Sequence, residues 1–232
     1  MSFAAAWAHA RDVEGWLTEA QARRLHTAAA AVAPAGRVVE IGSFRGRSAI
    51  VLAGAGVDEV VCIDPHAGSD RGPQEIAADA DRGEADVQTF RANLERAGVS
   101  GQIRHVRAFS AAALDAVEGE LDVLFVDGAH RFGPARADLA RWGARVRPGG
   151  RMLVHDSFSS VGVTLALATT TLSPRGRWRY VGRDGSLAEF ERTAAPGWSS
   201  TAAQLRQVPW FAANVVRKAL ILAGVRKGPW PY

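Results

Sequence analysis

The sequence contains a single cysteine, Cys62, so no intrachain disulfide can form. It has no run of about 20 apolar residues that would span a bilayer, and its first residues lack the basic and apolar regions of a secretory signal. Lysine is scarce, and the arginines are spread along the chain, so the net charge of +4 does not indicate a nucleic-acid surface. These absences predict a cytoplasmic protein without a nucleic-acid partner and without stable membrane insertion.

The 232 residues suit one domain of the α/β kind. Strand and helix patterns alternate after the break at Pro34-Ala35-Gly36. The predicted strands cover residues 37–41, 59–63, 102–107, 121–126 and 151–155. The predicted helices between and after them cover residues 46–53, 84–97, 110–117, 133–146 and 159–171. Such alternation predicts a Rossmann-like, mostly parallel sheet with helices on both faces.

The end of this region has the pattern of a β-hairpin, with strands at 178–182 and 186–191 around Asp184-Gly185. The hairpin completes a predicted seven-stranded sheet with an antiparallel edge. We therefore divide the chain into an N-terminal helical segment (1–34), a main domain (35–193) and a C-terminal tail (194–232).

The two flanking segments are predicted to be helical. Residues 3–33 have near-helical apolar spacing, with a capping box at Thr18 and Gln21, and this segment is expected to form a lid or a wall for a substrate. The tail carries an apolar helix from about residue 207 to 223. It can pack on the core, contact a second subunit in a homodimer or lie on a membrane surface; the first two are favoured.

A glycine-rich turn follows the first strand, in Glu40-Ile41-Gly42-Ser43-Phe44-Arg45-Gly46-Arg47-Ser48. Ligands of open α/β sheets bind beyond the carboxyl ends of the strands, where glycine permits a close approach of the backbone. The spacing is not the Gly-x-Gly-x-x-Gly of dinucleotide folds. Asp64 closes the second strand and is suited to accept ribose hydroxyls. Two acids without a phosphate-binding lysine fit a nucleoside cofactor that carries a positive charge and no phosphates.

Acids and histidines follow the fourth and fifth strands. Asp127 and His130 follow the fourth, and His155 with Asp156 ends the fifth, so all four are expected at one rim of the sheet. A histidine is a suitable general base near neutral pH, and carboxylates suit Mg²⁺. The alternative is structural: Asp127-Gly128 is a common turn, and Asp156 can cap the next helix.

These motifs, together with Phe125-Val126-Asp127-Gly128-Ala129-His130, Pro148-Gly149-Gly150 and His155-Asp156, resemble class I S-adenosylmethionine-dependent methyltransferases. The sequence is most similar to the branch that holds macrolide-sugar O-methyltransferases and cephalosporin-hydroxylase-like proteins. The resemblance covers roughly residues 36–160. It implies S-adenosylmethionine as cofactor, with contacts from the following residues: Glu40, Gly42, Ser43, Gly46, Ser48 and Asp64, and, near the adenine, Phe109 and Ser110.

The resemblance also implies a reaction. It makes His130 the general base of an O-methyl transfer and assigns a divalent metal, Mg²⁺, to Asp127, His155 and Asp156. His155 stands where the relatives have an acid, which favours Mn²⁺ if it binds the metal; otherwise it faces the substrate. The expected acceptor is a sugar hydroxyl, such as a mannoside or another unit of an oligosaccharide. A catechol or phenol acceptor, a non-catalytic cofactor-binding protein and, more remotely, an NAD-dependent dehydrogenase are the alternatives.

Overall fold

A computed structural model describes residues 1–69 and 77–225 of the chain. Within these residues lies a seven-stranded sheet with the order β3-β2-β1-β4-β5-β7-β6. Its strands are β1 (Val38–Ile41), β2 (Val60–Ile63), β3 (Ile103–Val106), β4 (Leu121–Val126), β5 (Val146–Val154), β6 (Trp178–Asp184) and β7 (Leu187–Arg192). The sheet confirms the predicted fold class.

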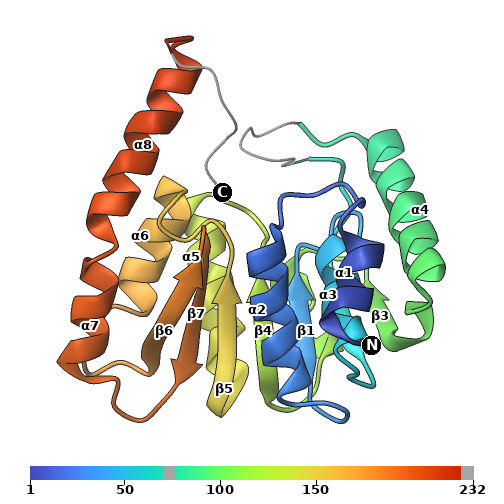
Figure 1. Cartoon of the computed structure of the whole chain (residues 1–232), viewed down its shortest axis with the longest axis horizontal. Coiled ribbons are helices and arrows are strands. Elements are labelled where there is room, and N and C mark those ends of the chain that lie inside the picture. Colours follow the sequence, from blue (N-terminus) through green and yellow to red (C-terminus); the bar gives the residue numbers. More distant parts are fainter. Residues whose placement is uncertain (70–76, 226–232) are drawn as a thin grey trace.

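The first five strands run parallel, and the last two form an antiparallel edge (Figure 1). β1 pairs with β2 on one side and with β4 on the other, so the chain reverses its direction of winding between β1 and β4. In open α/β sheets the ligand site lies at this crevice, beyond the carboxyl ends of the strands. The topology therefore puts the glycine-rich turn and the residues after β4 at the expected site.

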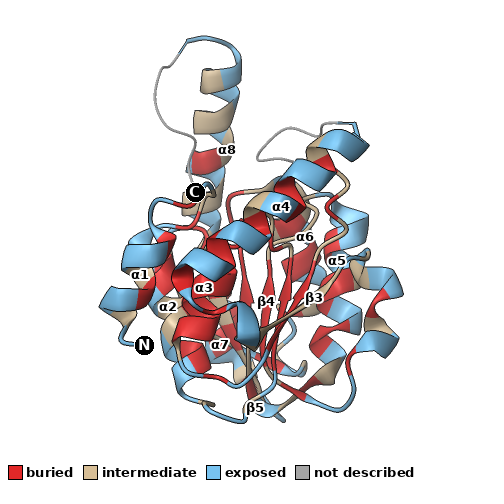
Figure 2. Cartoon of the chain, turned by 90° about the vertical axis from the view of Figure 1, so that its right-hand side faces the viewer, coloured by how far each residue is buried: buried red, intermediate tan, exposed pale blue. Residues whose placement is uncertain are grey.

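Helices cover both faces of the sheet, and the strands between them are buried (Figure 2). One face packs against α1 (Phe3–Ala10), α2 (Glu19–Ala30), α3 (Arg47–Gly54) and α4 (Ala80–Ala97). The other face packs against α5 (Phe132–Arg141) and α6 (Val161–Thr170). The apolar side chains of the central strands thus enter two separate core clusters, as a doubly covered parallel sheet requires.

The N-terminal segment differs from the continuous helical pattern expected over residues 3–33. It forms α1 and α2, with residues 11–18 as a connection between them. Thr18 is the N-cap of α2, and the predicted capping box with Gln21 is present. An N-cap residue has extended backbone angles, so the chain before it cannot continue as the same helix.

The prediction of an α-helix at 110–117 is wrong. The chain instead forms two 3₁₀ turns, Ser110–Ala112 and Leu114–Ala116. Side chains from elsewhere bind the carbonyl groups that a longer helix would need: Trp142 donates to Ser110, Arg145 to Leu114 and Arg104 to Ala116. These tertiary hydrogen bonds outweigh the helical propensity of the alanines.

The C-terminal region contains one predicted and one unpredicted helix. The expected helix at about 207–223 is present as α8 (Val208–Leu222). α7 (Gly197–Leu205) was not predicted, because its polar Ser200 and Thr201 are poor helix formers. Their side chains instead bond to Tyr180 and Leu172 of the main domain. No helix of the described residues is long and apolar enough to cross a membrane.

Two segments lie outside the described residues, the second of them at the end of the predicted C-terminal tail. They are residues 70–76, in the polar stretch after β2, and residues 226–232, at the end of the C-terminal tail. β5 also begins earlier than predicted, at Val146, and includes Pro148-Gly149-Gly150. The pairing of β4 with β5 shifts register between Leu121 and Val123, which accommodates this glycine-rich stretch.

Candidate active site

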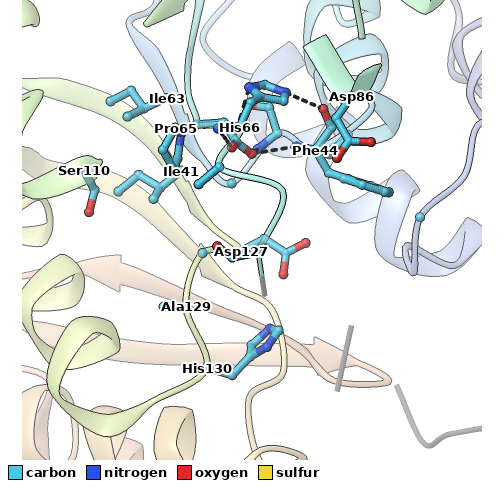
Figure 3. A pocket seen from close by; sticks show the side chains of 18 of the residues that line it. Ile41, Phe44, Ile63, Pro65, His66, Asp86, Ser110, Asp127, Ala129 and His130 are labelled. Atoms are coloured by element: carbon cyan, nitrogen blue, oxygen red, sulfur yellow. Dashed lines mark hydrogen bonds and ion pairs between the residues drawn. The ribbon is translucent and has the colours of Figure 1, made fainter. Parts of the chain in front are cut away.

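A cavity of about 260 Å³ opens at the crevice between β1 and β4. Its walls come from the turn after β1, the residues after β2 and β4, and the connection between α1 and α2. Figure 3 shows Asp127 and His130 on one side of this space and Phe44 and Asp86 on the other. The cavity therefore joins the predicted cofactor turn to the predicted catalytic residues.

The turn after β1 requires glycine at two positions. Gly42 has φ +88°, and a Cβ atom there would lie 2.2 Å from the carbonyl oxygen of Asp127. Gly46 has φ +89° and is the N-cap of α3, next to the ring of Phe90. Both positions combine a left-handed backbone with close packing, which explains the Gly-x-x-x-Gly spacing. Gly42 lines the cavity, as do Ser43 and Ser48, whereas Gly46 does not.

Asp64 holds the turn in place through its backbone. One carboxylate oxygen accepts hydrogen bonds from the N–H groups of Ser43 and Phe44, at 2.9 and 2.8 Å. The other accepts from the N–H of His66 at 2.7 Å. A carboxylate oxygen has more than one acceptor site, and Asp64 lines the cavity, so it can also accept hydroxyl groups of a bound ribose.

Glu40 lies beneath the turn and does not reach the cavity. It is fully buried, and neither carboxylate oxygen has a hydrogen-bond partner of ordinary geometry among the described residues. Burial raises the pKa of Glu40 to about 7, although the nearby hydroxyls of Ser48 and Ser43 oppose the shift. A direct cofactor contact from Glu40 stays a prediction; its position favours an indirect role through the turn.

The predicted adenine end of the cavity contains Phe109, Ser110 and a carboxylate that the sequence analysis missed. Phe109 is 64% exposed. Ser110 donates to Asp138 of α5, and burial raises the pKa of Asp138 although this hydrogen bond opposes it. Both Ser110 and Asp138 line the cavity. No local motif marks Asp138, because it reaches the site only through the packing of α5 beside the 3₁₀ turn.

The connection between α1 and α2 forms a wall of the cavity, from Glu14 to Leu17. Arg45 pairs with Glu14 of this wall and with Asp86 of α4. Trp16 stacks on Phe44, with ring centroids 5.5 Å apart. These contacts tie the N-terminal segment, which the sequence analysis expected to form a lid or a wall, to the glycine-rich turn.

Arg47 adds two hydrogen bonds to this wall, donating to the carbonyl oxygens of Gly15 and Arg11 at 2.6 and 2.8 Å. His66, which follows β2, also lines the cavity. Its Nε2 donates to the carbonyl oxygen of Phe44 at 2.8 Å. The turn is therefore supported from both of its sides by side chains from other elements.

The four predicted acids and histidines form a chain of contacts. Nδ1 of His155 is 3.2 Å from Asp127 Oδ1 and 3.9 Å from Asp156 Oδ2, while Nε2 of His130 is 2.9 Å from Asp156 Oδ2. Asp127 and His130 line the main cavity, and His155 and Asp156 lie behind them. His155 is 2% exposed, so it does not reach an acceptor in the main cavity.

Electrostatics in this cluster favour charged side chains. Burial lowers the pKa of His130, but Asp156 and Asp127 raise it more, so the pKa lies above its ordinary value. Burial also opposes the charge on His155, yet Asp127 and Asp156 raise its pKa to about 9. The pKa of Asp156 is held well below its usual range by His130 and His155, against the effect of burial. Each histidine is therefore stabilised as an imidazolium by a carboxylate.

Asp156 also has an unusual backbone, with φ +55°. The N-cap of α6 is Ser160, so Asp156 does not cap that helix as the structural alternative proposed. Its Oδ1 has no hydrogen-bond partner among the described residues. A strained aspartate with an unpaired buried oxygen is typical of a functional position.

The predicted metal ligands do not form a metal site as they are placed. Across residues 1–69 and 77–225, no group of three or more His, Cys, Asp or Glu side chains is arranged to hold a metal ion. Asp127 and Asp156 instead both contact Nδ1 of His155, at 3.2 and 3.9 Å. The present arrangement therefore does not fit the divalent metal that the resemblance implied.

The fold and the position of the cavity define the class: an α/β domain with a ligand site at the carboxyl ends of its parallel strands. Among solved structures, the chain is similar to TomG from Streptomyces achromogenes, an O-methyltransferase involved in tomaymycin synthesis and solved with SAM, at 20% identity and a TM-score of 0.57 over 82% of this chain and 88% of TomG. It is similar to the O-methyltransferase NovP at 18% identity and a TM-score of 0.61, over 77% of this chain and 83% of NovP. Cofactor-bound Rv0187 from MTB matches at 21% identity and a TM-score of 0.57, over 84% of this chain and 89% of that one.

The sequence matches a family described as a methyltransferase domain over residues 39–157, slightly more than half of the chain. The chain belongs to this family. The matched residues include the glycine-rich turn, Asp64 and the cluster of acids and histidines. The predicted recognition as a class I S-adenosylmethionine-dependent methyltransferase is thereby confirmed.

Proposed function

We propose that the chain transfers a methyl group from S-adenosylmethionine to a sugar hydroxyl, with His130 as the general base. One observation carries the proposal: His130 lines the same cavity as Gly42 and Asp64, and its Nε2 is 2.9 Å from a carboxylate oxygen of Asp156. A cofactor site and a candidate base thus share one space, as transfer from sulfur to an acceptor oxygen requires.

The residues on the cofactor side of the cavity suit S-adenosylmethionine. The polar groups of Asp64, Ser110 and Asp138 face the cavity at places suited to a ribose and an adenine, and Gly42 leaves room for a close approach. When bound, S-adenosylmethionine supplies an electrophilic methyl group. Asp127 adds a negative charge at the rim of the cavity, where a positive sulfonium is favoured.

His130 acts on the acceptor. Its Nε2 lies 2.9 Å from a carboxylate oxygen of Asp156, which leaves Nδ1 to take the proton of the acceptor hydroxyl. As the proton arrives, the ring becomes an imidazolium, and the negative charge of Asp156 stabilises it. The hydroxyl oxygen would gain the methyl group as the bond between that methyl and sulfur breaks, and it would lose its proton to His130. The products would then be a methyl ether, S-adenosylhomocysteine and a protonated histidine.

The proposed reaction does not include a metal, because two of the predicted ligands, Asp127 and Asp156, each contact the third, His155. The resemblance predicts that EDTA abolishes turnover and that Mg²⁺ or Mn²⁺ restores it. The observed contacts favour the opposite result, in which turnover persists in EDTA. Measuring methyl transfer with EDTA, with Mg²⁺ and with Mn²⁺ distinguishes the two.

The sugar acceptor rests on the Asp-x-x-His pattern of Asp127 and His130. A catechol or phenol is the second candidate, favoured by the aromatic Trp16 and Phe44 in the wall of the cavity. A screen of methyl transfer to free sugars, glycosides and catechols tests the choice. A different result is that the protein binds S-adenosylmethionine without transferring its methyl group to any acceptor, and that His130→Ala binds it equally well. That result would favour a non-catalytic cofactor-binding protein.

A further inference from the structure

The outward face of α8 consists entirely of apolar residues. At helical spacing it presents Val208, Ala212, Val216, Ala219, Leu220 and Ala223, all of them exposed. A helix on the surface of a soluble domain ordinarily directs charged or polar residues to solvent. Val216 is 59% exposed and Leu222 is 69% exposed. We call these six residues, together with Leu222, the α8 face; it lacks a partner among the described residues.

The inward side of α8 packs against the main domain and fixes the helix there. Trp210 and Phe211 pack against the core, and Arg183 lies over the ring of Trp210 at 3.8 Å. Asn214 donates to the carbonyl oxygen of Phe158, and Lys218 to that of Ser159. α8 is therefore anchored beside the loop that carries Asp156, and its last turns extend past this loop (Figure 1).

The charged residues of the tail that contains α8 all have the same sign. Residues 194–232 contain no aspartate or glutamate, and they contain five basic residues: Arg206, Arg217, Lys218, Arg226 and Lys227. The neighbouring α6 carries no acid either, and it exposes Val161 and Leu165. Trp198 of α7 is 75% exposed. An apolar helix face with basic residues and an exposed tryptophan is the pattern of a helix that lies in a membrane interface.

We propose that the α8 face docks the protein on an anionic lipid bilayer. In a symmetric dimer the same face would meet its own copy, and the basic residues of the two tails would approach each other with no acid of the tail to neutralise them. Anionic headgroups supply the missing negative charge, and the acyl region covers the apolar side chains. Docking of this kind is peripheral and needs no spanning helix.

Sedimentation of the full chain with vesicles tests the proposal. Vesicles of phosphatidylcholine are compared with vesicles that contain about 30 mol per cent phosphatidylglycerol, a composition that gives a strongly negative surface. We expect binding to the anionic vesicles and little to the neutral ones. High salt should weaken the binding, since it screens surface charge.

Two sets of variants locate the contact. The double change Val216→Ser and Leu220→Ser should reduce vesicle binding about tenfold with an unchanged midpoint of thermal unfolding, because both side chains are exposed. Arg206→Ser should weaken binding severalfold. Its matched control is Arg91→Ser, an equal change of charge at an exposed position of α4, at the opposite end of the sheet (Figure 1).

Three results would overturn the proposal. One is the absence of binding to anionic vesicles. Another is binding that the double variant leaves unchanged. The third is a dimer, measured by light scattering, that Val216→Ser and Leu220→Ser dissociate, because a second copy would then cover the α8 face. None of these measurements depends on methyl transfer.

Discussion

The two sides of the main cavity are held by different kinds of contact. On the cofactor side, a carboxylate binds backbone N–H groups of the turn: Asp64 accepts from Ser43, Phe44 and His66. On the acceptor side, ionisable side chains bind one another, as His155 does with Asp127 and His130 with Asp156. Backbone contacts fix a shape at any pH near neutrality, whereas a network of ion pairs changes with protonation. The first arrangement suits binding, and the second suits proton transfer.

Removing the base should have the largest effect on the acceptor side. His130→Ala is expected to lower kcat about 10²- to 10⁴-fold, because a positioned general base contributes about that much. Affinity for S-adenosylmethionine should stay unchanged, since the cofactor side keeps its own contacts. Steady-state kinetics with calorimetric titration of the cofactor measures both quantities.

The matched control is His9→Ala, which changes an exposed histidine of α1. It should leave kcat as it is. Unimpaired turnover in His130→Ala would remove the assignment of His130 as the base and, with it, the proposed division of labour between the two sides.

The next largest effect is expected from a methyl group on the cofactor side. Gly42→Ala combines a left-handed φ of +88° with a Cβ only 2.2 Å from the Asp127 carbonyl oxygen. We expect it to lower the free energy of unfolding by about 3 kcal/mol or more and to weaken cofactor binding. Chemical denaturation and cofactor titration report the two effects.

Gly56 offers a matched control for this change. Its φ is +93°, and a Cβ there would meet nothing within 4 Å. Gly56→Ala should therefore cost about 1–2 kcal/mol, the cost of the left-handed backbone alone. Equal losses in the two variants would show that the close approach between Gly42 and Asp127 does not constrain the turn.

Features of the site that depend on local sequence could be predicted, whereas features that depend on packing between distant elements could not. The parallel strands end in recognisable residues, and Gly42, Gly46 and Asp64 follow from local spacing. Asp138 does not, because it reaches the cavity only through the packing of α5. For the N-terminal segment the sequence predicted a wall or lid, but it did not indicate that residues 14–17 would form it.

The cluster of acids and histidines was predicted in part. That Asp127, His130, His155 and Asp156 share one rim follows from the order of strands. Their pairing does not, since it depends on the positive φ of Asp156 and on the burial of His155. The resemblance suggested a metal between these residues, whereas side-chain geometry paired the histidines with the acids.

Glu40 tests whether the cofactor side is as insensitive to pH as its backbone contacts suggest. Its pKa in the folded chain is about 7, above the ordinary 4.5, so folding favours the protonated carboxyl. The free energy of unfolding is therefore not reduced by Glu40 below the unfolded pKa of this group, and it falls as the pH rises through 7. Glu40→Gln should therefore stabilise the protein increasingly with pH, by about 3 kcal/mol at alkaline pH.

Thermal and chemical unfolding at pH 5 and pH 8 measures this difference. Glu95→Gln is the control, since Glu95 is an exposed residue of α4, and its effect should not vary with pH in that range. A stabilisation by Glu40→Gln that is equal at both pH values would show that Glu40 is not buried as a titrating group.

The smallest predicted effect concerns the wall over the glycine-rich turn. Trp16 stacks on Phe44 and lines the cavity, and such a pair contributes about 0.5–1.5 kcal/mol. Trp16→Ala should therefore raise KM for S-adenosylmethionine severalfold and leave kcat nearly unchanged, because the acceptor side does not depend on this contact. Trp198→Ala, at a tryptophan that is 75% exposed on α7, should change neither constant in an assay without lipid. A fall in kcat as large as that of His130→Ala would instead mean that the N-terminal segment takes part in placing the acceptor, and that the two sides of the cavity are coupled through it.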